Sequence, residues 1–290
     1  MKLGVFTVCT PQFNVEEAIA QIAAAGFNGI EWRITEDHGN RNQPQFWSGN
    51  RTSMTAQELK SRAQDLLARC AEYGLSMPSL GTYLDEDQRD PIESCLEAAL
   101  AIGATAIRVK PAAYPPPDRQ RYQNLLQASR AKFAGLAELA ERYGVRILIE
   151  THPGHIAPSV SKARQILEGL DPKHVGIMWD PSNQVAEGLE TYRMAIDIAG
   201  EYLAEVHVKN QRYVSEKRED GSIHWHTLPC PLPEGVVNWK KVFEELHHAG
   251  YTGWLMLEDF CEELPLDRRL TFDATYLRGL LADVQSASKN

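Results

Sequence analysis

Short apolar runs alternate with helical patterns along the whole chain. Eight runs of four to six residues carry few polar positions, and six of them follow closely on a glycine. A glycine suits the position just after a helix, where a left-handed backbone conformation ends it. The eight runs predict strands at Leu3–Val8, Ile30–Ile34, Leu75–Leu80, Ala106–Val109, Val145–Ile149, Val175–Trp179, Leu203–Val208 and Trp254–Leu257.

Capping residues and spaced apolar positions predict helices between these runs. Asn14 with Glu17, and Thr55 with Glu58, have the spacing of N-cap and N3 pairs. The segment 118–143 carries a single apolar stripe and is the longest predicted helix. Pro78 weakens the third strand, because proline cannot donate to a ladder and a barrel has no free edge; a bulge would accommodate it.

The order of these elements defines the expected fold. Strands that are apolar on both faces, separated by amphipathic helices, indicate a parallel sheet covered on both sides. A chain of 290 residues suits two small domains or one α/β barrel, and eight strand–helix units favour a (β/α)8 TIM barrel. No linker or low-complexity tract divides the chain, so residues 1–290 are expected to form one domain. Two long loops, 35–53 and 210–237, are expected at the functional, carboxyl ends of the strands.

Composition narrows the class of protein. A formal net charge of −9 and a pI near 5.5 leave no broad basic surface for nucleic acid, which favours a small-molecule substrate. Five cysteines, without a C-x-x-C spacing, argue against a disulfide framework or a zinc ribbon and indicate a reducing compartment. No apolar stretch reaches the roughly 18 residues of a membrane span, and no signal sequence is apparent. We expect a cytoplasmic protein without a membrane partner.

The last four predicted strands end in side chains that can bind a metal. Glu150, Asp180 and Glu258 follow directly on apolar runs, and His207 lies near the end of the seventh. In a barrel these positions converge at the C-terminal mouth. Singly, each could be an N-cap, a solvated rim charge or, for His207, a buried core residue. Together, three carboxylates would repel unless they took up protons or a cation.

A divalent ion resolves this repulsion most simply. Oxygen-rich ligation with one imidazole suits Mn²⁺ or Mg²⁺, with Co²⁺ and Zn²⁺ as alternatives. The sequence therefore predicts a metal site formed by Glu150, Asp180, His207 and Glu258.

Four motifs resemble one family. They are IETH at 149–152, WDPSN at 179–183, VHVKN at 206–210 and GYTGWLMLE at 250–258. The chain is similar, over nearly its whole length, to the xylose isomerase-like barrel superfamily in its sugar phosphate isomerase/epimerase branch. The resemblance implies the same four metal ligands, and implies that Glu150 and Glu258 also act as the acid/base pair. Asn183 departs from the ketose epimerases, which usually have a substrate-contacting histidine there.

Such a site favours proton transfer beside a carbonyl. A metal that binds the carbonyl and a neighbouring hydroxyl stabilises an enediolate, and two glutamates can then move the proton. An isomerase or epimerase of a sugar or sugar-like keto compound is the first hypothesis. A metal-dependent dehydratase acting on a keto-inositol or a dehydroshikimate-like compound is the second. A non-catalytic sugar-binding barrel is a further possibility, and an apurinic endonuclease-like repair enzyme is a remote alternative.

Further residues are candidates for substrate binding. They are Lys110, His152, Asn183, Lys209 and Arg212, which follow strands four to seven. Trp47 and Trp225, in the two long loops, could form apolar walls against a sugar ring, or a subunit contact in a homo-oligomer. Cys9 is expected to be a small buried residue.

Overall fold

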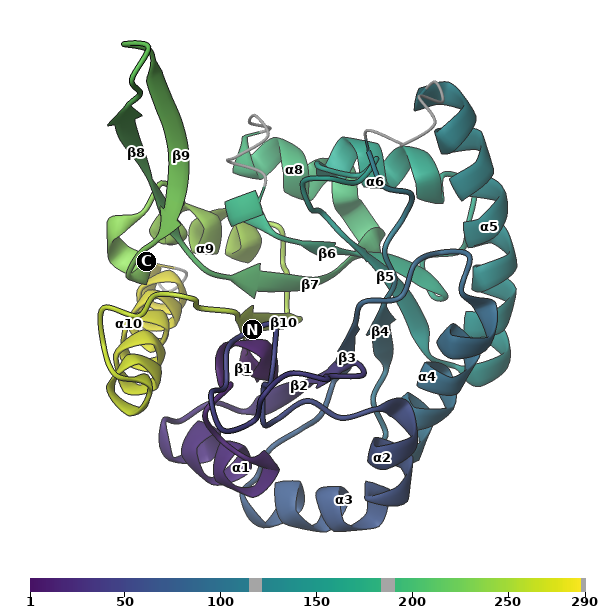
Figure 1. Ribbon diagram of the computed structural model, residues 1–290. Coiled ribbons are helices and arrows are strands. Elements are labelled where there is room, and N and C mark those ends of the chain that lie inside the picture. Colours follow the sequence, from purple (N-terminus) through teal and green to yellow (C-terminus); the bar gives the residue numbers. More distant parts are fainter. Residues whose placement is uncertain (115–121, 184–190, 288–290) are drawn as a thin grey trace.

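The computed structural model describes residues 1–114, 122–183 and 191–287 and shows a closed barrel of eight parallel strands (Figure 1). The order around the barrel is β1-β10-β7-β6-β5-β4-β3-β2, and every neighbouring pair is parallel. The strands are β1 (Lys2–Phe6), β2 (Gly29–Ile34), β3 (Ser79–Thr82), β4 (Ala106–Arg108), β5 (Arg146–Glu150), β6 (Val175–Trp179), β7 (Leu203–Val208) and β10 (Trp254–Leu257). The expected TIM barrel is confirmed.

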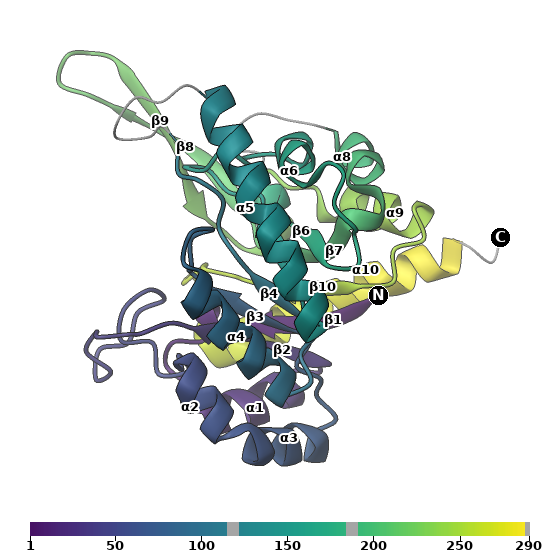
Figure 2. The ribbon, with the colours of Figure 1, turned by 90° about the vertical axis from the view of Figure 1, so that its right-hand side faces the viewer.

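Helices surround the barrel (Figures 1 and 2). They are α1 (Val15–Ala24), α2 (Ala56–Ser61), α3 (Ala63–Glu72), α4 (Arg89–Ala101), α5 (Tyr122–Tyr143), α6 (Val160–Leu167), α8 (Tyr192–Ala199), α9 (Trp239–His248) and α10 (Leu266–Ala287). Short 3-10 turns lie at η1 (Thr7–Cys9), η2 (Gly200–Tyr202) and η3 (Leu232–Glu234). None of the described helices combines the length and the apolarity needed to cross a membrane.

Local sequence signals set the ends of several helices. Asn14 and Thr55 both form capping boxes, in which the cap side chain and the glutamate three residues later bond each other's backbone N–H. Helix α5 begins at Tyr122 within the described residues, and the predicted start near residue 118 lies outside them. Within the described residues α5 and α10 each have 22 residues, so no described helix is longer than α5.

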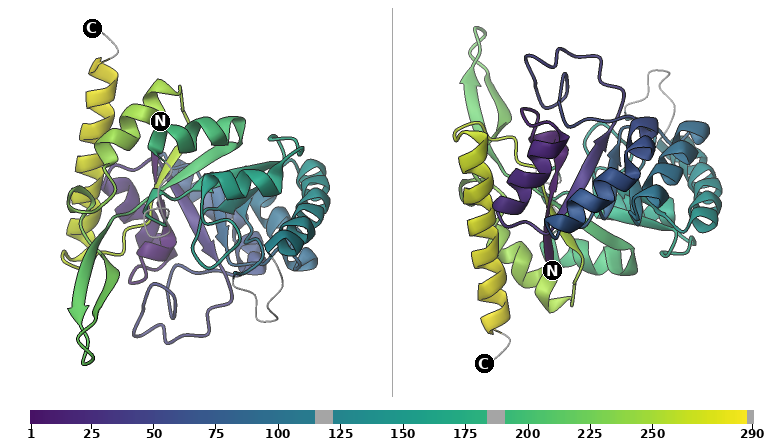
Figure 3. Two further views of the ribbon diagram at one scale, coloured as in Figure 1. Left: turned by 90° about the horizontal axis from the view of Figure 1, so that it is seen from above. Right: turned by 90° about the horizontal axis from the view of Figure 1, so that it is seen from below.

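Three predicted segments differ from the observed ones. The first predicted strand ends at Phe6 rather than Val8, because Thr7 and Val8 belong to η1. Strand β3 begins at Ser79 rather than Leu75, directly after Pro78, whose missing N–H cannot join the ladder. The segment 210–237, expected as a loop, contains an antiparallel hairpin of β8 (Gln211–Lys217) and β9 (Ile223–Pro229). This hairpin and the loop 35–53 extend from the same end of the barrel (Figures 2 and 3).

Strand β7 shows how the barrel divides its core. Val206 and Val208 pack in the main hydrophobic core. Glu205 and His207 alternate with them and bond to residues of β3 and β2, so they face the barrel interior. The interior is therefore polar from the middle of β7 to its carboxyl end, where the candidate site lies.

Candidate metal centre and substrate cavity

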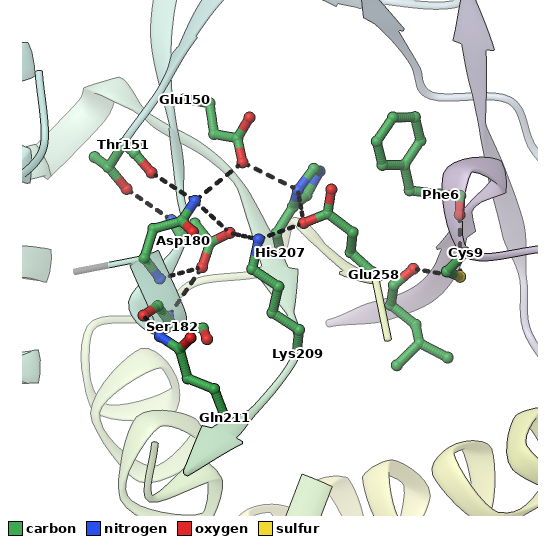
Figure 4. Close-up of polar contacts among 12 residues, drawn as sticks. Phe6, Cys9, Glu150, Thr151, Asp180, Ser182, His207, Lys209, Gln211 and Glu258 are labelled. Atoms are coloured by element: carbon green, nitrogen blue, oxygen red, sulfur yellow. Dashed lines mark hydrogen bonds and ion pairs between the residues drawn. The ribbon is translucent and has the colours of Figure 1, made fainter. Parts of the chain in front are cut away.

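The structure brings the four predicted ligands together at the C-terminal mouth of the barrel (Figure 4). Glu150 ends β5, Asp180 and Glu258 immediately follow β6 and β10, and His207 is the penultimate residue of β7. One ligand atom from each lies within 4.8 Å of all the others, and all four residues are buried. Hydrogen bonds from the Asp180 N–H to Thr151 and from the Glu258 N–H to Val208 fix the two positions that follow strands.

Lys209 provides a cation beside two of these carboxylates. Its Nζ lies 2.6 Å from Asp180 Oδ2 and 2.7 Å from Glu258 Oε2. Burial opposes the charge on this ammonium, but Asp180 and Glu258 outweigh burial and hold the pKa of Lys209 well above its usual range. The two carboxylates thus share one permanent positive charge.

Arg108 provides a second buried cation, on the other side of the cluster. Its Nη1 lies 2.6 Å from Glu150 Oε2, and its guanidinium packs over the rings of Tyr83 and Phe6. Burial alone would raise the pKa of Glu150, but Arg108 overrides it and lowers that pKa below its ordinary value. Glu150 is consequently an ionised carboxylate.

The remaining acids respond to the same competition between burial and neighbouring charge. Burial would raise the pKa of Glu258, but Lys209 and His207 lower it far below its usual range. For Asp180 burial prevails, and its pKa is raised despite Lys209. Glu150 and Glu258 are therefore the more strongly ionised pair.

The orientation of His207 fits a metal ligand. Its Nε2 lies 2.8 Å from Glu31 Oε2, while its Nδ1 has no hydrogen-bond partner among the described residues. Nδ1 faces the cluster, at 3.4 Å from Glu258 Oε2 and 3.8 Å from Glu150 Oε1. This buried, unpartnered nitrogen and the three carboxylates beside it together form a set of ligand atoms that suits a divalent ion.

A cavity of about 340 Å³ opens above this cluster. Of the four candidate ligands only Glu150 and Glu258 are among its lining residues. Trp47 and Phe260 form an aromatic wall with ring centroids 5.2 Å apart, and Tyr83 packs edge-on to Trp47. Polar groups complete the lining: Arg108, Lys110, His152, His155, Ser182, Asn183, Lys209, Asn210 and Gln211.

Four of the five predicted substrate-binding residues line the cavity, namely Lys110, His152, Asn183 and Lys209. Lys110 pairs with Asp85 at 3.0 Å. Asn183 is fixed from below, because its Nδ2 donates to Asp180 Oδ2 at 2.9 Å and to the Thr151 carbonyl at 3.1 Å. Asn183 therefore both contacts a candidate metal ligand and lines the cavity.

Arg212 is the predicted residue that the structure does not bring to the site. It is absent from the cavity lining, and its guanidinium pairs with Glu263 and Glu234. Arg212 is the second residue of β8, so it belongs to the hairpin and does not continue the direction of β7. The two tryptophans also separate: Trp47 lines the cavity, whereas Trp225 lies on β9 with 63% of its surface exposed.

Sequence reasoning missed residues both beneath the site and in the cavity lining, where Tyr83, Ser182, Asn210 and Gln211 are further examples. Glu31 and Glu205 lie below His207, and His155 and Phe260 line the cavity. Glu31 and Glu205 alternate with apolar residues in their runs, as Arg33 and His207 do, and polar residues at every second position of a buried strand are a sequence signal for a barrel interior. Burial lowers the pKa of His155 to about 4, so it presents a neutral imidazole to the cavity.

Residues 19–280 match the family described as xylose isomerase-like TIM barrel, and the chain belongs to that family. The curated relatives with an activity in their names include a dehydratase and an isomerase. The inosose dehydratase of Geobacillus thermodenitrificans is 28% identical over 129 residues, which is 42% of this chain and 43% of the relative. The 2-oxo-tetronate isomerase of Pectobacterium atrosepticum is 25% identical over 249 residues, or 81% of this chain and 82% of the relative. The match to the dehydratase thus spans less than half of its length.

Solved structures with this fold include three useful neighbours. A D-tagatose 3-epimerase-like protein has a TM-score of 0.73 at 17% identity, covering 99% of this chain and 100% of the other. The probable 3-DHS dehydratase AsbF from Bacillus anthracis has a TM-score of 0.71 at 19% identity, covering 96% and 99%. The IOLI protein, whose structure contains a bound zinc atom, has a TM-score of 0.71 at 16% identity, covering 98% and 99%. At these identities the likeness establishes the fold alone.

Proposed function

We propose that this protein is a divalent-metal-dependent isomerase or epimerase of a sugar or sugar-like keto compound. One observation carries the proposal: of the four candidate ligands, the two glutamates face the cavity. A bound divalent ion would supply the Lewis acid that polarises the substrate carbonyl. Glu150 and Glu258 come from separate strands and are both ionised, so each can take or return a proton at the adjoining carbon.

The stereochemical outcome depends on how the two glutamates share the proton. If one removes a proton from one face of the carbon and the other returns it to the opposite face, the product is an epimer. Return to the neighbouring carbon gives an aldose–ketose isomerisation. Lys209, beside Glu258, is placed to balance negative charge that develops on the substrate oxygen.

Dehydration is the second candidate. The partial match to inosose dehydratase and the fold shared with a probable dehydratase favour it. The same proton abstraction, followed by loss of a β-hydroxyl, would yield this product. A keto-inositol, which is uncharged, would then be favoured over a dehydroshikimate-like compound, which carries a carboxylate.

We infer that the substrate carries no phosphate or carboxylate. Each cationic side chain that lines the described part of the cavity has an acidic partner: Arg108 with Glu150, Lys209 with Asp180 and Glu258, and Lys110 with Asp85. An anionic substrate would have to break one of these pairs. The aromatic wall of Trp47 and Phe260 suits the apolar face of a neutral ring.

Other aspects of the sequence hypothesis stay predictions. Mn²⁺ or Mg²⁺ is still expected, and the zinc atom in the IOLI structure adds weight to Zn²⁺. A nucleic-acid substrate is not proposed, because the formal charge is −9. Cytoplasmic location and homo-oligomerisation are likewise proposed from the sequence, and Trp225 with Ile223 on the exposed hairpin would suit a subunit contact.

The test is turnover of neutral ketoses and inososes in D₂O with Mn²⁺ present. Solvent deuterium in a product of substrate mass supports isomerisation or epimerisation, whereas loss of water supports dehydration. Glu258→Gln should lower turnover by at least about 100-fold. Glu262→Gln, which changes an exposed glutamate a few residues away, is the matched control and should leave turnover unchanged.

Metal content must be measured for Glu258→Gln, because a lost ion would also stop turnover. Full activity of this variant with its ion bound would refute the acid/base role. If the protein converted only phosphorylated substrates, the inference of an uncharged substrate would be wrong.

A further inference from the structure

We infer that Glu31 is a positioning residue that holds His207 in the orientation and tautomer needed to bind the ion. The inference rests on the proposed metal site. Glu31 is central in β2, whereas His207 is on β7, and the two strands are separated by β1 and β10 in the barrel. Glu31 therefore reaches across the interior to place Oε2 at 2.8 Å from His207 Nε2, and both side chains are fully buried.

This hydrogen bond selects the nitrogen that faces the cluster. A histidine that binds a metal ion must be neutral. If its Nε2–H then donates to Glu31, the lone pair is on Nδ1, which faces Glu150 and Glu258. Without Glu31, the ring could carry its proton on Nδ1 and donate to Glu258 instead. That tautomer would block the position where the ion is expected.

Packing around Glu31 keeps this geometry. The ring of Phe6 lies 5.6 Å from the imidazole of His207. A Cβ on Gly81 would lie 2.3 Å from Phe6 and 3.0 Å from Glu31 Oε1, so the glycine on β3 makes room for both side chains. Gly81 therefore helps to position His207, because a side chain at position 81 would displace Phe6 or Glu31.

Glu205 is the natural comparison within the same buried layer. Its Oε1 is 3.6 Å from His207 Nε2, beyond hydrogen-bond distance, and its Oε2 accepts from Ser79 Oγ at 2.9 Å. It also lines a separate cavity of about 310 Å³ that Pro78, Thr105 and Arg146 share. Glu205 is also buried, but its carboxylate bonds to Ser79 and not to His207.

The experiment measures Mn²⁺ affinity by calorimetry on metal-stripped protein. Glu31→Leu should weaken binding by about 10- to 100-fold, the range found when a group that orients a metal-binding histidine is removed. Glu31→Gln keeps an acceptor oxygen and should restore most of that loss. Glu205→Gln is the matched control and should bind within about threefold of the wild type.

A spectroscopic readout separates positioning from a general structural effect. In the Zn²⁺-loaded wild type, the NMR spectrum should show a slowly exchanging, hydrogen-bonded Nε2–H on His207, and Glu31→Leu should lose this signal. If Glu31→Leu does not fold, the comparison of Glu31→Gln with Glu205→Gln still decides, because the substitution at position 31 should shift the Nε2–H signal and the one at position 205 should not.

Two outcomes would overturn the inference. One is wild-type affinity and an unchanged Nε2–H signal in the Glu31 variants. The other is two ions per wild-type chain, with one lost on substitution of either Glu31 or Glu205, since these residues and His207 would then form a second metal site. A wild-type protein that binds no divalent ion would instead refute the proposed function, so the two failures are distinguishable.

Discussion

Lys209 lies where it competes with a divalent ion, because its ammonium contacts Asp180 and Glu258 at hydrogen-bond distance. Lys209→Met should tighten Mn²⁺ binding by about tenfold, since it removes one positive charge from the cluster. Turnover should fall about 100-fold, because the charge that balances the developing oxyanion is also lost. Calorimetry and steady-state kinetics measure the two effects.

Lys110→Met is the control for that change, because Lys110 lines the same cavity but pairs with Asp85. Its metal affinity should equal that of the wild type. If Lys209→Met weakened metal binding, Lys209 would help to hold the ion rather than compete with it.

Trp47 is the second residue with a testable role. Arg33 fixes its carbonyl at 3.1 Å, and its ring packs on Phe260 at the cavity wall. Trp47→Ala should raise KM about tenfold with little change in kcat, because a stacked wall contributes to binding and not to the proton transfer. Trp225→Ala, at a similarly exposed tryptophan outside the cavity, should leave both constants unchanged. Equal effects of the two substitutions would remove Trp47 from the substrate site.

The four candidate ligands could be predicted from sequence because each lies at or near the end of an apolar run, where strand polarity determines its location. Arg212 could not be placed this way. Its position depends on the turn of the chain into β8, which no strand pattern specifies. Glu31 and His155 belong to contacts between segments distant in sequence, so no local spacing reveals their partners.

At the scale of elements, α10 docks on the barrel through a buried acidic pair. Arg269 lies 3.4 Å from Asp259 and bonds the carbonyls of Cys9 and Cys261. Burial, and then the charge of Asp259, raise the pKa of Asp273 to about 9. Asp273 thus binds a proton in the folded state that it releases on unfolding near neutral pH.

Because the pKa of Asp273 is raised in the folded state, the free energy of unfolding falls as the pH rises. Its contribution to stability is full below the ordinary pKa near 4 and is lost as the pH rises toward about 9. Asp273→Asn removes this titration and should therefore raise the melting temperature more at pH 8 than at pH 5. Thermal unfolding followed by circular dichroism from pH 5 to 9 measures it. Parallel curves for the variant and the wild type would contradict a raised pKa.

Element boundaries show a similar division between local and distant causes. The capping boxes at Asn14 and Thr55 are local, and both helices begin where predicted. The late start of β3 is also local, since Pro78 removes a donor. The β8–β9 hairpin was missed because its exposed strands lack a buried apolar face to give an alternating pattern.

For the whole molecule, the barrel was predictable because eight apolar runs alternate with helical patterns and six of the runs follow a helix-ending glycine. The substrate was not, because the cavity walls come from the loop 35–53, the hairpin base and the segment after β10. Each wall depends on how a loop folds back over the barrel. The periodicity of strands and helices does not predict the conformation of these loops.

Metal binding should stabilise the whole barrel, because the ligands lie near the carboxyl ends of β5, β6, β7 and β10 and are brought together only in the folded state. At a metal concentration about 100 times Kd, linkage contributes about 2.7 kcal/mol. A protein of this size should then melt about 5 °C higher with Mn²⁺ than with EDTA.

Asp180→Asn should abolish this metal-dependent shift, since it removes a buried ligand that does not line the cavity. Asp85→Asn, which changes an exposed carboxylate paired with Lys110, should keep the full shift. A shift of equal size in both variants would place the ion elsewhere on the chain. Loss of the shift in Asp180→Asn alone, with an unchanged melting temperature in EDTA, would show that the four strand ends act together as one binding site.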